Sequence, residues 1–235
     1  MIFHDLHEDF DRDILERFHR DVLEPSFSAD ETVALEALAA SIRLGNALVT
    51  VGLGEEGEVL GGIVGDWFDG QRVLLISYLA VRPDLRGQSI GTDLRGRAVE
   101  TWPGQKPAHL VVAEVHDPRV WDGVGGDQSV ARLRLFERFG ARMLDVPFVQ
   151  PRLQPGTDRV SGFLLLAFLV DEAILVGAED GEGIRSRLIG HWIRSYYELA
   201  EGARPPYDPE LEELLNRVER DDTVALLPLS AALAP

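Results

Sequence analysis

A short glycine-containing loop is the segment of this sequence whose residue types are best suited to chemistry. The residues from Leu79 to Leu94 read LAVRPDLRGQSIGTDL, which is the end of an apolar run, a loop and the start of a helical pattern. The first turn of a helix leaves backbone N–H groups unpaired and carries partial positive charge, so it binds phosphate groups well. Gly87 and Gly91 let a pyrophosphate approach the backbone, and Arg86 adds a charge-assisted contact. The segment predicts a phosphate cradle, with a strand-to-helix turn that binds nothing as the alternative.

The commoner phosphate-binding and metal-binding patterns do not occur in the chain. There is no GxGxxG of a dinucleotide fold and no GxxxxGK[ST] of a nucleoside triphosphate site. The 235 residues include no cysteine, which excludes disulfides, thiolate zinc sites and a cysteine nucleophile. The six histidines show neither HxxxH nor HxH spacing, so we expect no metal site.

The spacing of apolar residues predicts strands and helices that alternate around this loop. The run VLLISYLAV before the loop is almost wholly apolar, as in a strand buried on both faces. The predicted strands are Met1–His4, Ala47–Leu53, Val59–Phe68, Arg72–Val81, His109–Val115, Arg142–Val149 and Val160–Leu169. The predicted helices are Phe10–Leu23, Thr32–Leu44, Ile90–Trp102 and Val130–Phe139. We therefore expect one α/β domain over residues 1–170.

Residues 171–235 have a different composition and predict a C-terminal helical extension. An acidic, glycine-rich linker over Ala178–Gly183 precedes an amphipathic run over Ile184–Leu199, and a charged helix over Asp208–Arg220 precedes a short strand-like run over Thr223–Leu229. The apolar stripe of the first helix includes Trp192 and is too hydrophobic to stay exposed. It must pack on its own core, on a second subunit or over a substrate cleft as a lid.

The charge of the chain limits its partners. Lys and Arg total 23 against 40 Asp and Glu, which gives a net charge of −17. Such a surface repels nucleic acid and attracts cationic molecules, although solubility alone is the alternative explanation. The acidic N-terminus is unlike a signal peptide, and the longest apolar stretch, Phe163–Val170, is far shorter than the ~20 residues of a membrane span. We expect a cytoplasmic protein, and its basic residues, arginines with the single exception of Lys106, are typical of a GC-rich bacterial genome.

Two motifs and their spacing resemble those of the GNAT superfamily of N-acetyltransferases. The residues from Arg86 to Gly91 resemble its acetyl-CoA-binding motif, [RQ]xxGx[GA], with Ser89 where glycine is usual. The run SVARLRLFERFGA from Ser129 to Ala141 resembles [NS]xxAxxxYxxxG. A narrower likeness is to a bacterial group of mostly unassigned substrate. The resemblance implies the GNAT fold, a mixed and mainly antiparallel central sheet flanked by helices, over residues 1–170.

The resemblance also implies which residues bind acetyl-CoA as a co-substrate. The pyrophosphate would lie on the loop amides, and the pantetheine would pair as an extra strand with the end of Arg72–Val81. A backbone N–H near Leu79 or Ala80 would polarise the thioester carbonyl. The implied contact residues are Leu79, Ala80, Val81, Arg86, Gly87, Gln88, Ser89, Ile90, Gly91 and Thr92.

Direct attack by an acceptor amine requires a general base, because amines are mostly protonated at pH 7. Glu114 is the first candidate, since it interrupts the apolar strand LVVAEV near its end, where burial would raise the pKa of a carboxyl group. The alternative is that Glu114 pairs with an arginine such as Arg132. His116 is the second candidate because an imidazole titrates in the useful range. Asp117 is the third, with turning the chain before Pro118 as its alternative role.

The general acid of the family is a tyrosine, and Phe136 stands at its position. Three explanations are open: the thiolate leaves unassisted, another hydroxyl serves, or the domain retains only CoA binding. Tyr78, Tyr196 and Tyr197 are the available hydroxyls. We predict that the extension brings Tyr196 or Tyr197 to the place that Phe136 leaves without a hydroxyl.

The sequence thus predicts an acetyl-CoA-dependent N-acetyltransferase acting on a small-molecule amine, without metal, nucleic acid or membrane as a partner. A cationic acceptor is one option that the net charge leaves open. Two alternatives stay open: acetylation of a protein or peptide amine, and a non-catalytic acyl-CoA-binding regulatory module. Trp121, Asp122 and Asp127 lie in a loop that can line the acceptor cleft, as can Gln150. The oligomeric state, with a homodimer among the options, is open.

Overall fold

In the computed structural model, which describes residues 1–124, 128–178, 181–202 and 208–233, the chain divides into two units. Met1–Ala108 and Leu153–Thr157 form the first unit, and His109–Arg152 and Asp158–Pro235 form the second. The predicted boundary at residue 170 therefore differs from the boundary between the compact units. The candidate phosphate loop belongs to the first unit and Glu114 to the second.

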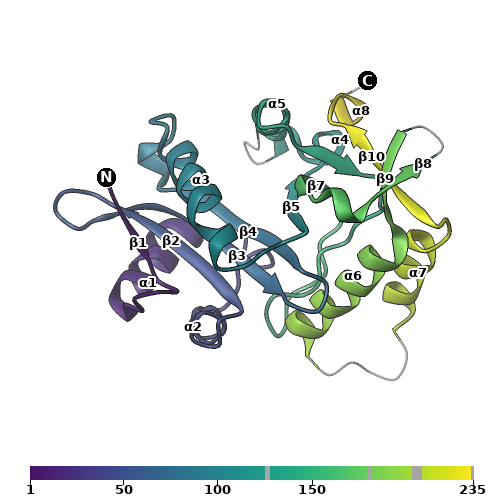
Figure 1. Ribbon diagram of the computed structural model, residues 1–235. Coiled ribbons are helices and arrows are strands. Elements are labelled where there is room, and N and C mark those ends of the chain that lie inside the picture. Colours follow the sequence, from purple (N-terminus) through teal and green to yellow (C-terminus); the bar gives the residue numbers. More distant parts are fainter. Residues whose placement is uncertain (125–127, 179–180, 203–207, 234–235) are drawn as a thin grey trace. The chain divides into compact units, whose positions relative to one another are not determined.

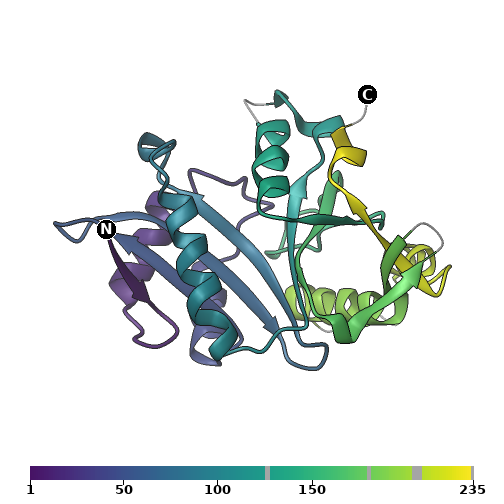
Figure 2. The same cartoon turned by 45° about the horizontal axis from the view of Figure 1, so that its top comes forward.

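The first unit is an antiparallel sheet with helices on both faces (Figures 1 and 2). Its strands are β1 (Ile2–Asp5), β2 (Ala47–Leu53), β3 (Val59–Phe68) and β4 (Val73–Val81), which lie side by side in that order. The helix α3 (Ile90–Thr101) covers one face, and α1 (Arg12–Phe18) and α2 (Leu35–Arg43) cover the other.

Two adjacent glycines of β3 allow this close packing. A Cβ on Gly62 would lie 2.6 Å from the ring of Phe18 in α1. A Cβ on Gly61 would lie 2.6 Å from the carbonyl oxygen of Ala80 and 3.3 Å from Leu94 of α3. Since neighbouring strand residues point to opposite faces, the pair fixes which helix lies on which side of the sheet.

The first predicted helix forms as an α-helix that continues as a π-helical turn, and the second predicted helix begins later than expected. Asp11 caps α1 by accepting the N–H groups of Asp13 and Ile14, and a π-helical turn over His19–Leu23 continues it. Ser28 and Glu31 have the spacing of a helix-capping pair, but the Ser28 hydroxyl bonds the side chain of Glu31, at 2.6 Å, in a local turn before the helix. The chain then stays extended until Leu35, because Val33 donates its N–H to the Tyr78 hydroxyl.

The second unit contains an antiparallel sheet of six strands in the order β5-β7-β6-β10-β9-β8. The strands are β5 (Leu110–His116), β6 (Arg142–Leu144), β7 (Phe163–Val170), β8 (Leu175–Ala178), β9 (Gly181–Arg185) and β10 (Thr223–Pro228). The helices are α4 (Pro118–Trp121), α5 (Ser129–Arg138), α6 (Ser186–Glu201), α7 (Pro209–Val218) and α8 (Ser230–Leu233).

The C-terminal residues are part of this second unit and contain strands as well as helices. β10 pairs with β6 on one side and β9 on the other. The predicted linker over Ala178–Gly183 instead falls in the β8–β9 hairpin, with residues 179–180 outside the described part. The predicted strand Arg142–Val149 stops at Leu144, because Val146 donates its N–H back to the Leu144 carbonyl at 2.9 Å in a tight turn, and Pro147 has no N–H to donate.

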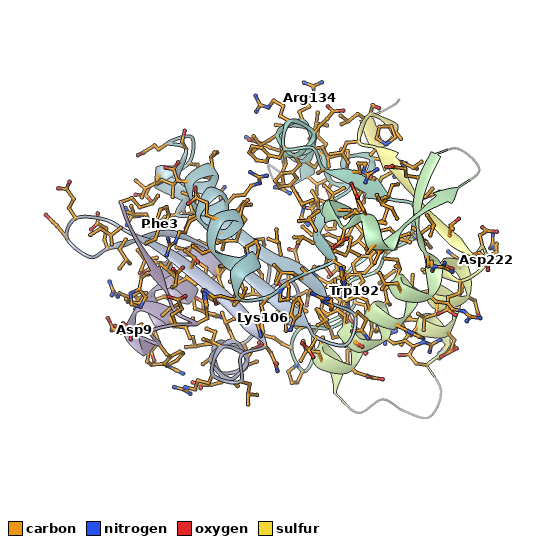
Figure 3. All side chains as sticks on the ribbon, in the orientation of Figure 1. Phe3, Asp9, Lys106, Arg134, Trp192 and Asp222 are labelled. Carbon is orange, nitrogen blue, oxygen red and sulfur yellow. The ribbon has the colours of Figure 1, made fainter. Side chains whose placement is uncertain are left out.

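The apolar stripe of α6 packs inside the second unit. Ile189, Trp192 and Ile193 are fully buried, and Figure 3 labels Trp192 among the side chains of this helix. Trp192 stacks on Tyr196, with ring centroids 5.9 Å apart. Own-core packing, one of the three options for this helix, accounts for the stripe.

The predicted α/β class is confirmed, and every strand pairing described within the two units is antiparallel. Across the described ranges, no helix is both long and apolar enough to cross a membrane. Nor do any three described His, Cys, Asp or Glu side chains group as metal ligands would.

Candidate functional site

The predicted phosphate loop lies between β4 and α3 in the first unit. A 3₁₀ turn over Pro83–Leu85 follows β4, Arg86 to Ser89 are exposed, and α3 begins at Ile90. Asp93 makes the first intrahelical bond, donating its N–H to the Ser89 carbonyl at 3.1 Å. The N–H groups of residues 90–92 therefore have no intrahelical acceptor, as an anion-binding helix start requires.

Two residues with positive φ reverse the chain into this helix. Gly87 has φ +83° and Ser89 has φ +65°. Glycine adopts this left-handed conformation without strain, whereas a side chain there costs about 1–2 kcal/mol. Ser89 makes no capping hydrogen bond that would offset the cost. This explains physically why the family motif has glycine at the position of Ser89.

Replacing Ser89 with glycine is expected to stabilise the protein by roughly 0.5–1 kcal/mol, because the left-handed strain disappears. The measurement is the denaturant midpoint of unfolding. Ser89→Ala keeps the Cβ atom and should give no such gain. A Ser89→Gly protein less stable than the parent would show that the hydroxyl has a stabilising partner, against this account.

The ten predicted acetyl-CoA-contacting residues lie together at this turn. Leu79, Ala80 and Val81 are the last residues of β4 and are paired with Ile63, Gly62 and Gly61 of β3. A Cβ on Gly91 would lie 3.6 Å from Val81, an ordinary contact. The exposed Arg86 donates to the Ser26 hydroxyl at 3.3 Å, a bond long enough for a phosphate to replace.

Glu114 is held by a buried glutamine in the second unit. Its Oε2 accepts a hydrogen bond from Nε2 of Gln150 at 2.5 Å. Gln150 is only 6% exposed, and its backbone exchanges hydrogen bonds with Val160 at 2.9 and 3.1 Å. The amide group of Gln150 therefore approaches the Glu114 carboxylate from a backbone position that is held by two hydrogen bonds. The sequence predicts that Gln150 can line the acceptor cleft, but it contains no signal for this bond to Glu114.

His116 and Asp117 differ in what surrounds them. The ring of His116 stacks on Trp121, with centroids 4.6 Å apart, and contacts Phe163 at 4.9 Å. Asp117 caps α4 by accepting the N–H of Arg119 and pairs with its guanidinium at 2.7 Å. Asp117 thus has the turn-forming role that was its alternative, and the helix α4 lies in a segment predicted as a loop.

Two of the remaining loop candidates, Trp121 and Asp122, lie in the described part of the chain and contact other residues of the second unit. Trp121 lies close to Gly162, whose Cβ would come within 2.7 Å of the indole nitrogen. Asp122 accepts the N–H of Val130 at 3.3 Å at the start of α5. Asp127 lies outside the described residues.

The hydroxyl that would replace the missing tyrosine is not identified by the contacts. Phe136 packs edge-on against Phe168, with centroids 5.1 Å apart. Tyr197 donates its hydroxyl proton to the Val149 carbonyl at 2.8 Å, and burial raises the pKa of this phenol. Tyr196 is buried on Trp192. The assignment of Tyr196 as general acid therefore stays a prediction.

Sequence reasoning missed one further acidic side chain, Asp66 of β3. Burial raises the pKa of its carboxyl group to about 6, although the Ser77 hydroxyl of β4 donates a hydrogen bond to it. The available signal was the one that singled out Glu114, an acidic residue inside an otherwise apolar strand.

Comparison with known proteins shows that part of the chain is similar to an enzyme family. Residues 8–120 match the model of the acetyltransferase (GNAT) family, and no curated protein matches the chain. A solved structure from Bacteroides thetaiotaomicron, assigned to the GNAT family, is 18% identical in sequence and has a TM-score of 0.59. The alignment covers 87% of this chain and 100% of that chain. The similarity at this TM-score confirms the predicted fold.

Two other solved structures resemble the chain more weakly. The ribosomal-protein-S18-alanine N-acetyltransferase from Escherichia coli is 14% identical, with TM-score 0.49, over 76% of this chain and 97% of its own. An aminoglycoside 6′-N-acetyltransferase complexed with coenzyme A is 17% identical, with TM-score 0.47, over 71% and 96%.

Proposed function

We propose that this chain, which over residues 8–120 belongs to the acetyltransferase (GNAT) family, transfers the acetyl group of acetyl-CoA to the amine of a small molecule. The observation that carries the proposal is the turn between β4 and α3. It combines an exposed arginine, two left-handed residues and the open start of a twelve-residue helix, in the order of the family motif. The net charge of −17 supports a cationic acceptor, because a negative surface attracts it.

The first unit supplies the groups that would bind acetyl-CoA. The loop amides from Arg86 to Gly91 hold the pyrophosphate, with Thr92 beside them, and Arg86 adds charge. The end of β4, from Leu79 to Val81, binds the pantetheine by backbone pairing. A backbone N–H of Leu79 or Ala80 donates to the thioester carbonyl and stabilises the oxyanion that forms during attack.

Glu114 supplies the base in this proposal. It accepts a proton from the acceptor nitrogen, directly or through water, so that the neutral amine attacks the thioester carbon. A C–N bond forms, the C–S bond breaks, and the sulfur leaves as a thiolate, which later takes a proton. Phe136 offers no proton, and a thiol with an ordinary pKa near 8.5 is a fair leaving group without one. Gln150 fixes the carboxylate of Glu114 while the proton moves.

Replacing Gly91 with glutamate tests the acetyl-CoA site, since it puts a carboxylate in the first turn of α3. We expect acetyl-CoA to raise the melting temperature of the parent, by an amount that reflects about 2.7 kcal/mol at 100 times Kd. The shift should vanish in Gly91→Glu, because the negative side chain repels the pyrophosphate. Gly91→Ala is the matched control and should keep the shift, because its Cβ has room.

An unchanged acetyl-CoA shift in Gly91→Glu would mean that this loop is not the phosphate site. The non-catalytic alternative, favoured by Phe136, predicts the same shifts but no release of CoA with any amine. Acetylation of a protein or peptide amine predicts release with such substrates and not with small amines.

A further inference from the structure

Asp66 is a partly buried carboxylate that has no cationic partner in the described ranges. It lies on β3, opposite Leu75 of β4 and Ala47 of β2. The Ser77 hydroxyl donates to its Oδ2, and no arginine, lysine or histidine lies within ion-pair distance among the described residues. The loss of water around it raises the pKa of the carboxyl group to about 6.

Several other sheltered carboxylates among the described residues are paired with arginines. Asp5 bonds Arg97 at 2.6 Å, and Asp117 bonds Arg119 at 2.7 Å. Glu201 and Asp208 share Arg159. Removing water from a charge without supplying an opposite one is costly, so unpaired carboxylates in such places are candidates for functional groups. Asp66 therefore lacks the positively charged partner that these carboxylates have. A bound cation would supply it.

A β-bulge places the hydroxyl partner of Asp66. Val64 pairs with Tyr78 and Gly65 with Ile76, which leaves Ser77 as an extra residue in β4. Bulges redirect a side chain and are frequent beside active sites. Ser77 precedes Leu79 by two residues, and two residues of extended strand span about 6.6 Å. Asp66 and Ser77 thus lie on the same pair of strands as Leu79, a proposed contact of the thioester. The separation of Ser77 and Leu79 along β4 is about the length of a small amine.

We propose that Asp66, positioned by Ser77, binds a positively charged nitrogen of the acceptor, and that the acceptor is a small molecule with a second amine besides the one acetylated. This inference rests on the proposed function, because it concerns the acceptor of that reaction. The bound nitrogen keeps its protons and donates them to the Asp66 carboxylate. The reacting nitrogen is a different atom, and its proton goes to the base.

A matched pair of acceptors tests the inference in the full-length protein. 1,4-Diaminobutane carries the second ammonium, and butylamine has the same carbon chain without it. We expect the parent to prefer the diamine at least tenfold in kcat/KM. Asp66→Asn keeps the shape and removes the charge, and it should raise KM for the diamine roughly 30-fold or more, since a sheltered cation loses its partner. The KM for acetyl-CoA should stay the same.

Two additional readouts keep the test decisive. Asp66→Asn should fold with an equal or higher melting temperature, because it removes an unpaired charge, and Ser77→Ala should weaken the preference for the diamine by a smaller factor. Equal kcat/KM for both acceptors in the parent, or an unchanged diamine KM in Asp66→Asn, would overturn the inference and leave the proposed function standing. Binding of acetyl-CoA without turnover of any amine would overturn the proposed function and this inference with it.

Discussion

Replacing Glu114 with glutamine is expected to lower kcat by about 10²–10⁴-fold, the usual contribution of a positioned general base. The change keeps the size of the side chain and its contact with Gln150, but it removes the group that accepts the proton. Acetyl-CoA binding should be little changed, because the proposed acetyl-CoA contacts belong to β4 and α3. The measurement is steady-state thiol release across pH, together with the acetyl-CoA-dependent shift of the melting temperature.

Glu137→Gln is the matched control, because Glu137 is an exposed glutamate of the same unit, on α5. It should leave kcat unchanged. Equal rates for Glu114→Gln and the parent at every pH would remove Glu114 as the base. His116, whose ring lies against Trp121 and Phe163, would then be the next candidate, to be tested as His116→Gln.

Replacing Arg159 with methionine is expected to destabilise the protein by about 3–5 kcal/mol. The sheltered Asp208 loses its arginine partner, and the sheltered Glu201 keeps only Arg152, at 3.4 Å. The Arg159 side chain is 8% exposed, and it bonds Glu201 at 2.8 Å, Asp208 and Glu210. It also lies 4.9 Å from the centre of the Tyr197 ring. These contacts join the end of α6 to the start of α7. The measurement is the denaturant midpoint at pH 7.

The effect of Arg159→Met should depend on pH in a defined direction. Hydrogen bonds from Arg159 hold the pKa of Asp208 at about 2, and that of Glu201 is also lowered. Groups with lowered pKa in the folded state stabilise it above their unfolded pKa near 4, and this contribution is lost as the pH falls toward 2. The difference between parent and variant should therefore be full at pH 7 and shrink between pH 4 and pH 2.

Arg134→Met is the control for this prediction. Arg134 extends outward from α5 in Figure 3 and forms no ion pair with a described residue. Its replacement should change stability by less than about 0.5 kcal/mol. A similarly small effect of Arg159→Met, or a loss that grows as the pH falls, would contradict the role assigned to Arg159.

The phosphate loop was predictable because its signal is local. A buried strand, two glycines, an arginine and a helix start follow one another within sixteen residues, and local geometry sets how they are placed. The structure adds that Ser89 has left-handed backbone geometry, which explains physically the glycine of the family motif at that position. Glu114 was detectable for a similar reason, since one charged residue stands out in an apolar strand.

Asp66 has the same signal, but at a position where it is easily overlooked. It lies three residues before Asp69-Gly70, a pair of residues typical of a hairpin turn, and acidic residues near turns are usually solvated. Its partner Ser77 becomes an extra residue in β4 only through the register with β3. Register is a property of two strands together, and neither strand alone contains it.

Long-range pairing also explains why the predicted extension differs from the second unit. Nothing local shows that Thr223–Pro228 pairs with Arg142–Leu144, some eighty residues earlier. Gln150 and Glu114 are likewise 36 residues apart. The sequence predicted the helices of this region from their amphipathic pattern, but it contained no comparable signal for the β8–β9 hairpin, whose acidic glycines resemble a linker.

Amine-dependent release of CoA is the most direct test of the central claim. The full-length protein is incubated with acetyl-CoA and a panel of small mono- and diamines, free thiol is measured, and the acetylated product is identified by mass. The account predicts equal amounts of thiol and acetylated amine from the parent, and neither from Gly91→Glu. Tight binding of acetyl-CoA with no thiol released by any amine, or undiminished release by Gly91→Glu, would contradict it.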